Sequence, residues 1–325
     1  MKAAVIERLG QAPRYGDAEE PTATDGAIGQ VLAAAVKNID RALVAGKHYG
    51  SGQLKLPGVA GIDAVVRLAD DRRVYTGATP PAGSMAERLV VNPALCVDIP
   101  DQVSDADAAA LPNAAVSAWF ALEYAGRIQP GQNVLVLGAT GITGALAVQL
   151  AKQKFGADRV VAVGRNAARL DQLLDNGADT VVRIGDAPER LGTEVARLHA
   201  ERPFDLVVDH LWGPPAEQTL RALAGSDLSA EFHRTRFVQI GSMAGPDITL
   251  PAAVLRSAGV ELVGQGAGSM PQDSAARIST EILPTLYAML AAGSISISTV
   301  TRPLADVTAA WDEKLPSGVR LVLVP

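Results

Sequence analysis

Three glycines at a spacing of three residues mark the first stretch of this chain that could carry chemistry. Gly138, Gly141 and Gly144 follow an unbroken apolar run, 134–137, and precede apolar residues at helical spacing. A tight glycine turn between a buried strand and a helix lets backbone N–H groups and the positive end of the helix approach a pyrophosphate. We therefore expect a dinucleotide-phosphate site here; the alternative is a tight turn of some other α/β protein. The expected contacts are Gly138, Thr140, Gly141, Ile142, Thr143 and Gly144.

An arginine follows the next expected strand, at the position that distinguishes the two nicotinamide dinucleotides. In dinucleotide folds, an acidic residue about 20 positions after the glycine turn binds the 2′-hydroxyl of NAD. Arg165 stands at that distance, and no carboxylate accompanies it. A guanidinium pairs with a 2′-phosphate, whereas a carboxylate repels it. The sequence thus predicts NADPH as the cofactor; the alternative is that the arginines here are solvated charges at the start of a helix. The expected contacts are Gly164, Arg165, Asn166 and Arg169.

Alternating strands and helices surround these residues and must position them. Apolar runs without alternation, which suit strands buried on both faces, are separated by segments with helical periodicity. This order predicts a doubly wound parallel sheet that binds its ligand at the carboxyl ends of the strands, near the switch point after Leu137. The expected strands are 134–137, 159–164, 180–184, 206–209, 237–240 and 260–263. The expected helices are 145–155, 167–176, 189–200, 216–223 and 252–258.

The first third of the chain shows short strands separated by glycine, proline and aspartate turns. We expect an irregular β domain with one short helix, 38–45, capped by Asn38. Two helices, 105–111 and 114–124, separated by Pro112, lead to the parallel sheet. The last segment has no sheet of its own, so we expect it to pack on the N-terminal domain. The strands expected first are 3–6, 31–36, 64–68, 74–75 and 89–91; the last segment is expected to contain helices 275–292 and 307–315 and extended segments 295–299 and 319–324.

The composition limits the class of protein. The chain has 325 residues, of which 48% are hydrophobic and 20% charged, as expected for a folded protein with two domains. Its net charge of −6 argues against nucleic acid or an anionic membrane as a partner. Cys96 is the only cysteine, which excludes an internal disulfide and a zinc site with several thiolates. The sequence shows no signal peptide and no apolar run of membrane-spanning length, so we expect a cytoplasmic protein.

Several motifs, taken in order, are similar to those of a known superfamily. They are Gly61-Ile62-Asp63, Gly83-Ser84-Met85-Ala86-Glu87, the glycine turn, and Gly318-Val319-Arg320-Leu321-Val322-Leu323. With its β-rich start and central parallel sheet, the chain resembles the medium-chain dehydrogenase/reductase superfamily, and within it the zinc-free quinone oxidoreductases. The resemblance implies an α/β fold with a GroES-like catalytic domain, 1–113 and 270–325, and a Rossmann domain, 114–269. It also implies further cofactor contacts at Leu211, Ile240, Gly241, Gly266 and Arg320.

The resemblance assigns positions to the zinc ligands of the superfamily's alcohol dehydrogenases. These positions hold Lys37, Ile62 and Asn113, and the four-cysteine structural zinc lobe is missing. Lysine and isoleucine do not bind zinc in such a site, and Asp63 alone is not one. We therefore expect reduction without a metal. Where the quinone reductases have an asparagine, this chain has Lys37, which leaves the substrate class open.

The candidate catalytic residues near the expected nicotinamide cleft are Lys37, Asn38, Asp40 and Tyr49. Without a metal, a carbonyl must be polarised by hydrogen-bond donors aimed at its developing negative charge. A lysine in a half-buried cleft donates a proton or neutralises that charge; the alternative is a strand-end lysine that extends to solvent. Asn38 is expected to cap the helix and Asp40 to orient its neighbours, while Tyr49 either donates to substrate or packs. His210, after a strand end, is a candidate for lining the nicotinamide site.

The expected function is the transfer of a hydride from NADPH to a quinone or a conjugated enone, because simple alcohol oxidation normally needs a metal or a strong base. Two alternatives stay open: a carbonyl or enoyl-thioester reductase of the same fold, and a non-catalytic NADPH-binding sensor or structural protein. A short-chain reductase is excluded, since no tyrosine has a lysine four residues later.

The resemblance implies a homodimer that covers the exposed edge strand 260–264.

Overall fold

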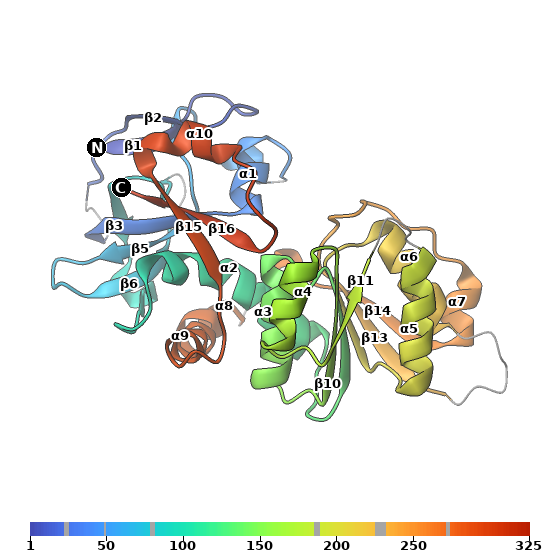
Figure 1. Ribbon diagram of the computed structural model, residues 1–325. Helices are drawn as coiled ribbons and strands as arrows, with labels where there is room; N and C mark the ends of the chain where they lie inside the picture. Colours follow the sequence, from blue (N-terminus) through green and yellow to red (C-terminus); the bar gives the residue numbers. More distant parts are fainter. Residues whose placement is uncertain (23–25, 49, 79–81, 185–188, 225–231, 271–273) are drawn as a thin grey trace. The chain divides into compact units, whose positions relative to one another are not determined.

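The computed structural model describes the chain except for residues 23–25, 49, 79–81, 185–188, 225–231 and 271–273. The chain divides into two compact units (Figure 1). The β-rich unit consists of Met1–Asn113 and Asp273–Pro325, and the parallel-sheet unit of Ala114–Gln272. Within the described residues, no helix combines the length and apolar character needed to span a membrane.

In the described part of the parallel-sheet unit, six strands form a sheet in the order β11-β10-β9-β12-β13-β14. Every pair of neighbours in it is parallel. This doubly wound order places a topological switch point between β9 and β12, and it confirms the predicted α/β fold. The strands are β9 (Asn133–Leu137), β10 (Arg159–Gly164), β11 (Thr180–Arg183), β12 (Leu206–Asp209), β13 (Arg234–Gln239) and β14 (Gly259–Gly264). The helices are α3 (Ile142–Gln153), α4 (Ala167–Leu174), α5 (Glu189–Glu201), α6 (Gly213–Leu223) and α7 (Ala252–Ser257), with a 3-10 turn at Ala267–Ser269.

The sheet's hydrophobic core explains its continuous apolar strands. All five residues of β9 are buried, because neighbouring strands flank it and both of its faces are covered. Leu135 and Val207, from adjacent strands, share a buried cluster with Val195 of α5 and Leu220 of α6. These two helices therefore pack on the same face of the sheet.

Within the described residues, the β-rich unit contains two sheets. A three-stranded sheet has the order β2-β1-β4, and a second sheet has the order β15-β16-β3-β5-β6-β8, with β7 also paired to β3. The strands are β1 (Lys2–Ile6), β2 (Arg14–Asp17), β3 (Ala27–Val36), β4 (Gly58–Val59), β5 (Asp63–Arg67), β6 (Arg73–Gly77), β7 (Arg88–Val91), β8 (Val97–Asp98), β15 (Ser298–Pro303) and β16 (Val319–Val324). The helices are α1 (Asn38–Val44), α2 (Asp105–Phe120, continuing past the unit boundary into a π-helical turn, Ala121–Ala125), α8 (Ser274–Arg277), α9 (Leu283–Ala291) and α10 (Val307–Trp311). Single 3-10 turns are Ser51–Gln53, Pro93–Leu95 and Leu304–Asp306.

The last strands of the chain join the sheet of the first third. Strand β16 pairs antiparallel with β3, with Leu321 opposite Val36 and Leu323 opposite Ala34. Strand β15 then extends this sheet by a parallel pairing with β16. The prediction that the last segment packs on the N-terminal domain is confirmed.

The predicted break at Pro112 is wrong. The structure has one continuous helix, α2, with Pro112 inside it. A proline in a helix leaves the carbonyl four residues earlier without its usual N–H partner. Here that carbonyl belongs to Ala108, and it accepts a hydrogen bond of 2.9 Å from the hydroxyl of Tyr287. A distant side chain thus satisfies the group that the proline leaves free, which local sequence cannot reveal.

The predicted helix 275–292 is also not uniform. Between α8 and α9 the chain forms a π-helical segment, Ile278–Ile282, and Pro284 lies in the first turn of α9. The wider turn relieves the clash that a proline ring makes with the carbonyl four residues before it. The extended segment predicted at 295–299 lies later in the structure, as β15.

Candidate active site

The glycine turn joins β9 to α3 as the sequence predicts. Gly138 has φ of 81°, a left-handed conformation that favours glycine. A Cβ atom on Gly144 would lie 2.3 Å from the carbonyl oxygen of Gly138, so only glycine lets the helix approach the turn this closely. Gly141 is the N-cap of α3 and has no side chain to cap it. The first N–H groups of this 12-residue helix are therefore left for an anion.

The end of β10 lies beside this turn. A Cβ atom on Gly164 would lie 2.4 Å from Cγ2 of Thr140, so the last residue of β10 packs directly on the turn. Arg165, the next residue, is exposed. Asn166 caps α4 through a 3.2 Å bond that its Oδ1 accepts from the backbone N–H of Arg169. The guanidinium of Arg169 in turn donates a 2.8 Å bond to Gln172. The exposed Arg165 is thus the more accessible of the two arginines.

The ends of β12 and β13 complete the same edge of the sheet. The backbone N–H groups of Ile240 and Gly241 donate to the carbonyl of Asp209, at 2.9 and 3.2 Å. A Cβ atom on Gly138 would lie 3.0 Å from Cδ2 of Leu211, so this side chain borders the glycine turn. Gly266 is exposed after β14, where its N–H donates to Oγ of Ser269 at 2.9 Å.

Two buried ionisable residues follow β12. Burial raises the pKa of Asp209 to about 6, against the effect of the N–H groups of Leu211 and Trp212 that donate to its carboxylate. Burial lowers the pKa of His210 to about 4, so the imidazole is neutral at physiological pH. In the turn after β12, Trp212 has φ of 55°, a strained conformation that the surrounding structure must hold.

In the β-rich unit, Lys37 forms a buried ion pair with Asp63. The side chain of Lys37 is 1% exposed, and its ammonium contacts Oδ1 of Asp63 and lies 3.5 Å from Oδ2 of Asp40. The backbone N–H of Lys37 also donates to Oδ2 of Asp40, at 2.8 Å. The sequence predicts a half-buried cleft around Lys37, but the structure buries this side chain. Because a charge at the end of a buried strand must be paired, Lys37 is held by carboxylates.

Further polar groups surround this ion pair. The hydroxyl of Tyr75 donates to Oδ2 of Asp63 at 3.0 Å, and burial raises the pKa of Tyr75 well above its ordinary value. Burial also raises the pKa of Asp40, while the Lys37 ammonium lowers it. Arg320 donates to the carbonyl of Val36 at 3.3 Å, and its pKa is lowered by burial against the effect of Asp40 and Asp63. We call Lys37, Asp40, Asp63, Tyr75 and Arg320 the buried charge cluster.

The other candidate catalytic residues have different surroundings. Asn38 is exposed and is the first residue of α1, whereas the N-cap position is held by Lys37. The predicted cap was therefore wrong, and Asp40 closes the helix start by accepting from the N–H of Lys37. Tyr49 lies outside the described residues. Arg320, predicted as a cofactor contact, lies in the buried charge cluster.

Asp63 and Tyr75 were not among the predicted site residues. One signal in the sequence could have found Asp63: a lysine directly after the apolar run 31–36 needs a buried carboxylate, and Asp63 starts the next apolar strand. Nothing in the spacing indicates Tyr75, since its approach to Asp63 depends on how β5 and β6 pair.

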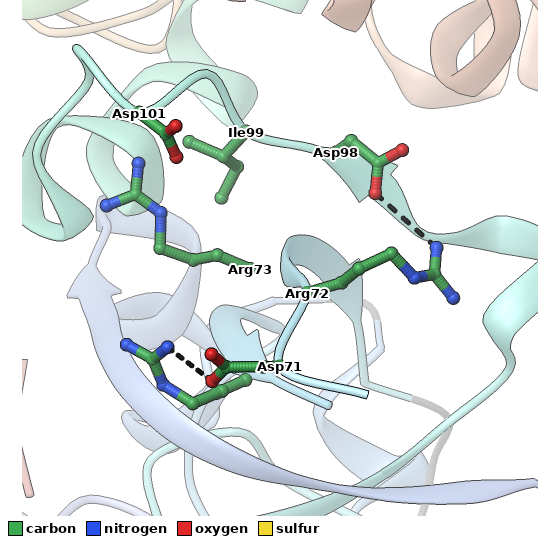
Figure 2. A pocket seen from close by; sticks show the side chains of 7 residues that line it. Asp71, Arg72, Arg73, Asp98, Ile99 and Asp101 are labelled. Atoms are coloured by element: carbon green, nitrogen blue, oxygen red, sulfur yellow. Dashed lines mark hydrogen bonds and ion pairs between the residues drawn. The ribbon is translucent and has the colours of Figure 1, made fainter. Parts of the chain in front are cut away.

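A surface pocket of the β-rich unit gathers charges of both signs (Figure 2). Its lining is Arg67, Asp71, Arg72, Arg73, Asp98, Ile99 and Asp101. Arg67 pairs with Asp71 at 2.8 Å and Arg72 with Asp98 at 3.5 Å. Because these guanidinium groups already face carboxylates at the surface, we assign no ligand to this pocket.

Comparison with known proteins agrees with this arrangement. A family model described as zinc-binding dehydrogenase matches residues 143–279. A probable NADPH-dependent quinone reductase of Emericella nidulans is 31% identical over 228 residues, which are 67% of this chain and 61% of that protein. Quinone oxidoreductase-like protein 2 of Bos taurus is 29% identical over 185 residues, 57% of this chain and 50% of its own length. The matched segments thus span less than two thirds of these curated relatives.

A solved structure extends the similarity to the whole chain. The quinone oxidoreductase of Thermus thermophilus, whose structure is described with its NADPH complex, is 27% identical and covers 100% of both chains with a TM-score of 0.80. By these comparisons the chain is similar to quinone reductases of the medium-chain dehydrogenase/reductase superfamily.

The match to a family model described as zinc-binding dehydrogenase makes the fit of a metal worth testing. Within the described residues, no group of three or more histidine, cysteine, aspartate or glutamate side chains is placed to hold a metal ion. The ammonium of Lys37 occupies the carboxylate of Asp63 and approaches that of Asp40, and a zinc ion would have to compete with it. The residues present do not fit zinc.

The same test for a nicotinamide dinucleotide has the opposite result. The parallel-sheet unit offers the uncapped start of α3, a close glycine turn and an exposed arginine at the next strand end. These groups suit a pyrophosphate and a 2′-phosphate.

Proposed function

We propose that this chain is an NADPH-dependent oxidoreductase that passes a hydride to a quinone or a conjugated enone without a metal ion. The observation that carries the proposal is the glycine turn at the switch point of the parallel sheet, with exposed Arg165 at the neighbouring strand end. Quinone reductases among its relatives, one of them named as NADPH-dependent, support the same activity.

The positive groups of the parallel-sheet unit favour NADPH over NADH. The first N–H groups of α3 would hold the pyrophosphate, and Arg165 would pair with the 2′-phosphate. Thr140 and Gly164 fix the distance between these two places, because they pack directly on each other. When bound, NADPH supplies a hydride from its reduced nicotinamide ring.

The proposal of metal independence is supported by the buried charge cluster. Lys37 supplies a fixed positive charge where the superfamily's dehydrogenases have a zinc ligand, and Asp63 and Asp40 hold it there. Since the side chain of Lys37 is 1% exposed, we propose an electrostatic role for this residue rather than direct proton donation. Asn38, exposed at the start of α1, and Tyr49 remain the proposed donors to the substrate.

We further propose a homodimer in which β14 of one chain faces β14 of its partner. β14 is the last strand of the parallel sheet, and Leu262 on it is 39% exposed. An edge strand with exposed apolar side chains needs a cover. Light scattering is expected to give twice the mass of the chain, and a monomer mass would refute this arrangement.

A substrate panel tests the proposed activity. The purified protein is mixed with NADPH or NADH and with quinones, enones, aldehydes or enoyl thioesters, and loss of the reduced nicotinamide is followed by absorbance. We expect substrate-dependent loss with quinones or enones, faster with NADPH than with NADH, and Arg165→Ala to reduce that preference. Loss with none of the substrates, or only with aldehydes or thioesters, would contradict the proposal.

A further inference from the structure

A histidine at the carboxyl end of β12 is buried with a ring nitrogen that lacks a partner. His210 is 9% exposed, and its Nε2 atom has no hydrogen-bond partner among the described residues. An unpaired buried polar group costs about 1–3 kcal/mol, so its presence in a native fold calls for an explanation such as a ligand.

The position of His210 relates it to the glycine turn. Its backbone N–H donates to the carbonyl of Leu137, the last residue of β9, at 3.2 Å. A Cβ atom on Gly138 would lie 3.3 Å from Cβ of His210, so the imidazole begins beside the first glycine of the turn. Because β9 and β12 flank the switch point, His210 lies where doubly wound sheets bind their ligands.

The backbone around His210 is fixed from both sides. A Cβ atom on Gly241 would lie 2.6 Å from the carbonyl oxygen of His210, so the end of β13 presses against it. The carboxylate of Asp209 accepts hydrogen bonds from the N–H groups of Leu211 and Trp212, at 2.8 and 3.1 Å. The side chain of His210 therefore starts from a rigid turn, as a ligand-positioning group must.

The charge state of His210 indicates which part of a dinucleotide it suits. Burial lowers its pKa to about 4, so the ring is neutral and offers one donor and one acceptor nitrogen. A phosphate would favour a charged partner, and Arg165 and the start of α3 already offer positive charge. A neutral imidazole is instead matched to uncharged polar groups, such as the ribose hydroxyls and the carboxamide of a nicotinamide nucleoside.

We propose that His210 is a hydrogen-bonding ligand for the uncharged polar groups of the nicotinamide nucleoside in the bound dinucleotide. This inference rests on the proposed NADPH-dependent function. His210 thereby adds orientation of the reactive half of the cofactor to the anchoring of its phosphates by the glycine turn.

Calorimetric titration with three probes tests the proposal without measuring activity. The probes are NADPH, 2′-phospho-ADP-ribose, which lacks the nicotinamide, and adenosine 2′,5′-bisphosphate, which lacks the whole nicotinamide nucleoside. One neutral hydrogen bond corresponds to about a 3- to 10-fold change in affinity. We expect His210→Phe to weaken NADPH by this factor and to leave the bisphosphate unchanged. A weaker 2′-phospho-ADP-ribose would assign the bond to the ribose, and an unchanged one to the carboxamide.

Two further variants serve as a repeat and as a control for this titration. His210→Leu repeats the test with a smaller side chain, and His233→Gln, at the start of β13, is the control expected to leave all three affinities unchanged. An NADPH affinity equal to wild type, or an equal loss for NADPH and the bisphosphate, would overturn the role of His210. Wild-type protein that binds none of the probes would overturn the proposed function itself, which is a different result.

Discussion

At the scale of single residues, the structure changes the surroundings expected for Lys37 from a half-buried cleft to a buried ion pair. The sequence indicates a lysine at a catalytic position but not its partners, which lie 3 and 26 residues further along the chain. Pairing between β3 and β5 brings Asp63 to the end of β3, and such long-range pairing has no signature in local spacing. The sequence thus singled out Lys37 as a candidate residue, whereas the buried charge cluster around it could not be predicted.

We expect the ion pair between Lys37 and Asp63 to contribute to the free energy of unfolding. Lys37→Met leaves buried carboxylates without their counter-charge, so we expect the free energy of unfolding to fall by about 3–5 kcal/mol. Asp63→Asn in the same chain removes one of those charges, so the double variant is expected to lose less than the sum of the single variants. Urea denaturation of the four proteins measures this coupling.

A surface ion pair serves as the control for this cycle. Lys152 pairs with Asp179 at 2.9 Å, with both side chains partly exposed, and Lys152→Met is expected to cost no more than about 1 kcal/mol. Additive effects of Lys37→Met and Asp63→Asn would contradict a buried, mutually dependent pair.

Because His210 is buried in its neutral form, we expect the free energy of unfolding to depend on pH. Burial lowers its pKa from 6.5 in the unfolded chain to about 4 in the fold, so between these values the unfolded chain binds more protons. This residue therefore removes stability as the pH falls from about 6.5 toward 4. His210→Phe cannot be protonated, and relative to wild type it is expected to gain about 2 kcal/mol between pH 7 and pH 5.

Urea denaturation of both proteins at the two pH values measures this difference. Asp209, whose pKa burial raises to about 6, has the opposite pH dependence, but it is present in both proteins and largely cancels. A difference in stability that stays constant with pH would show that His210 is not buried in its neutral form.

At the scale of elements, sequence patterns predicted strands and turns correctly where the packing of the fold requires the same residues. The strands at 159–164 and 206–209 have the predicted bounds, because both are apolar runs buried on two faces. The glycine turn was also predicted, since a left-handed residue and a close helix approach both require glycine. Prediction failed at Pro112 and at the cap of α1, where Tyr287 and Asp40 satisfy backbone groups that local rules leave free.

The close approach of α3 to the glycine turn makes a prediction about Gly144. A Cβ atom there would meet the carbonyl oxygen of Gly138 at 2.3 Å and Cα of Ala139 at 2.8 Å, so the helix start must shift. We expect Gly144→Ala to weaken NADPH binding by at least about 10-fold, because the N–H groups that hold the pyrophosphate move with it. Calorimetry with NADPH measures the loss.

Gly264, in β14, is the matched control. A Cβ atom on it would meet nothing within 4 Å, so Gly264→Ala is expected to bind NADPH as wild type does. Equal affinity of the Gly144→Ala protein would mean that the start of α3 does not hold the phosphates.

At the scale of the whole molecule, the alternation of strands and helices was enough to predict the parallel sheet. The return of β16 to β3 was expected only because the last segment lacks a sheet of its own, and its register could not be predicted. The same two-sheet unit holds the buried charge cluster, in which Lys37 pairs with Asp63 and lies near Asp40. We propose that Lys37 keeps a fixed positive charge at the position that the resemblance assigns to a zinc ligand.

The most direct test of this account is the turnover of NADPH with a quinone acceptor by protein from which metal has been removed. The protein is treated with a chelator, its metal content is measured by mass spectrometry, and its turnover is compared with that of untreated protein. We predict equal turnover before and after treatment, and no gain when zinc is added back. Turnover that disappears with the metal and returns with zinc would contradict the account.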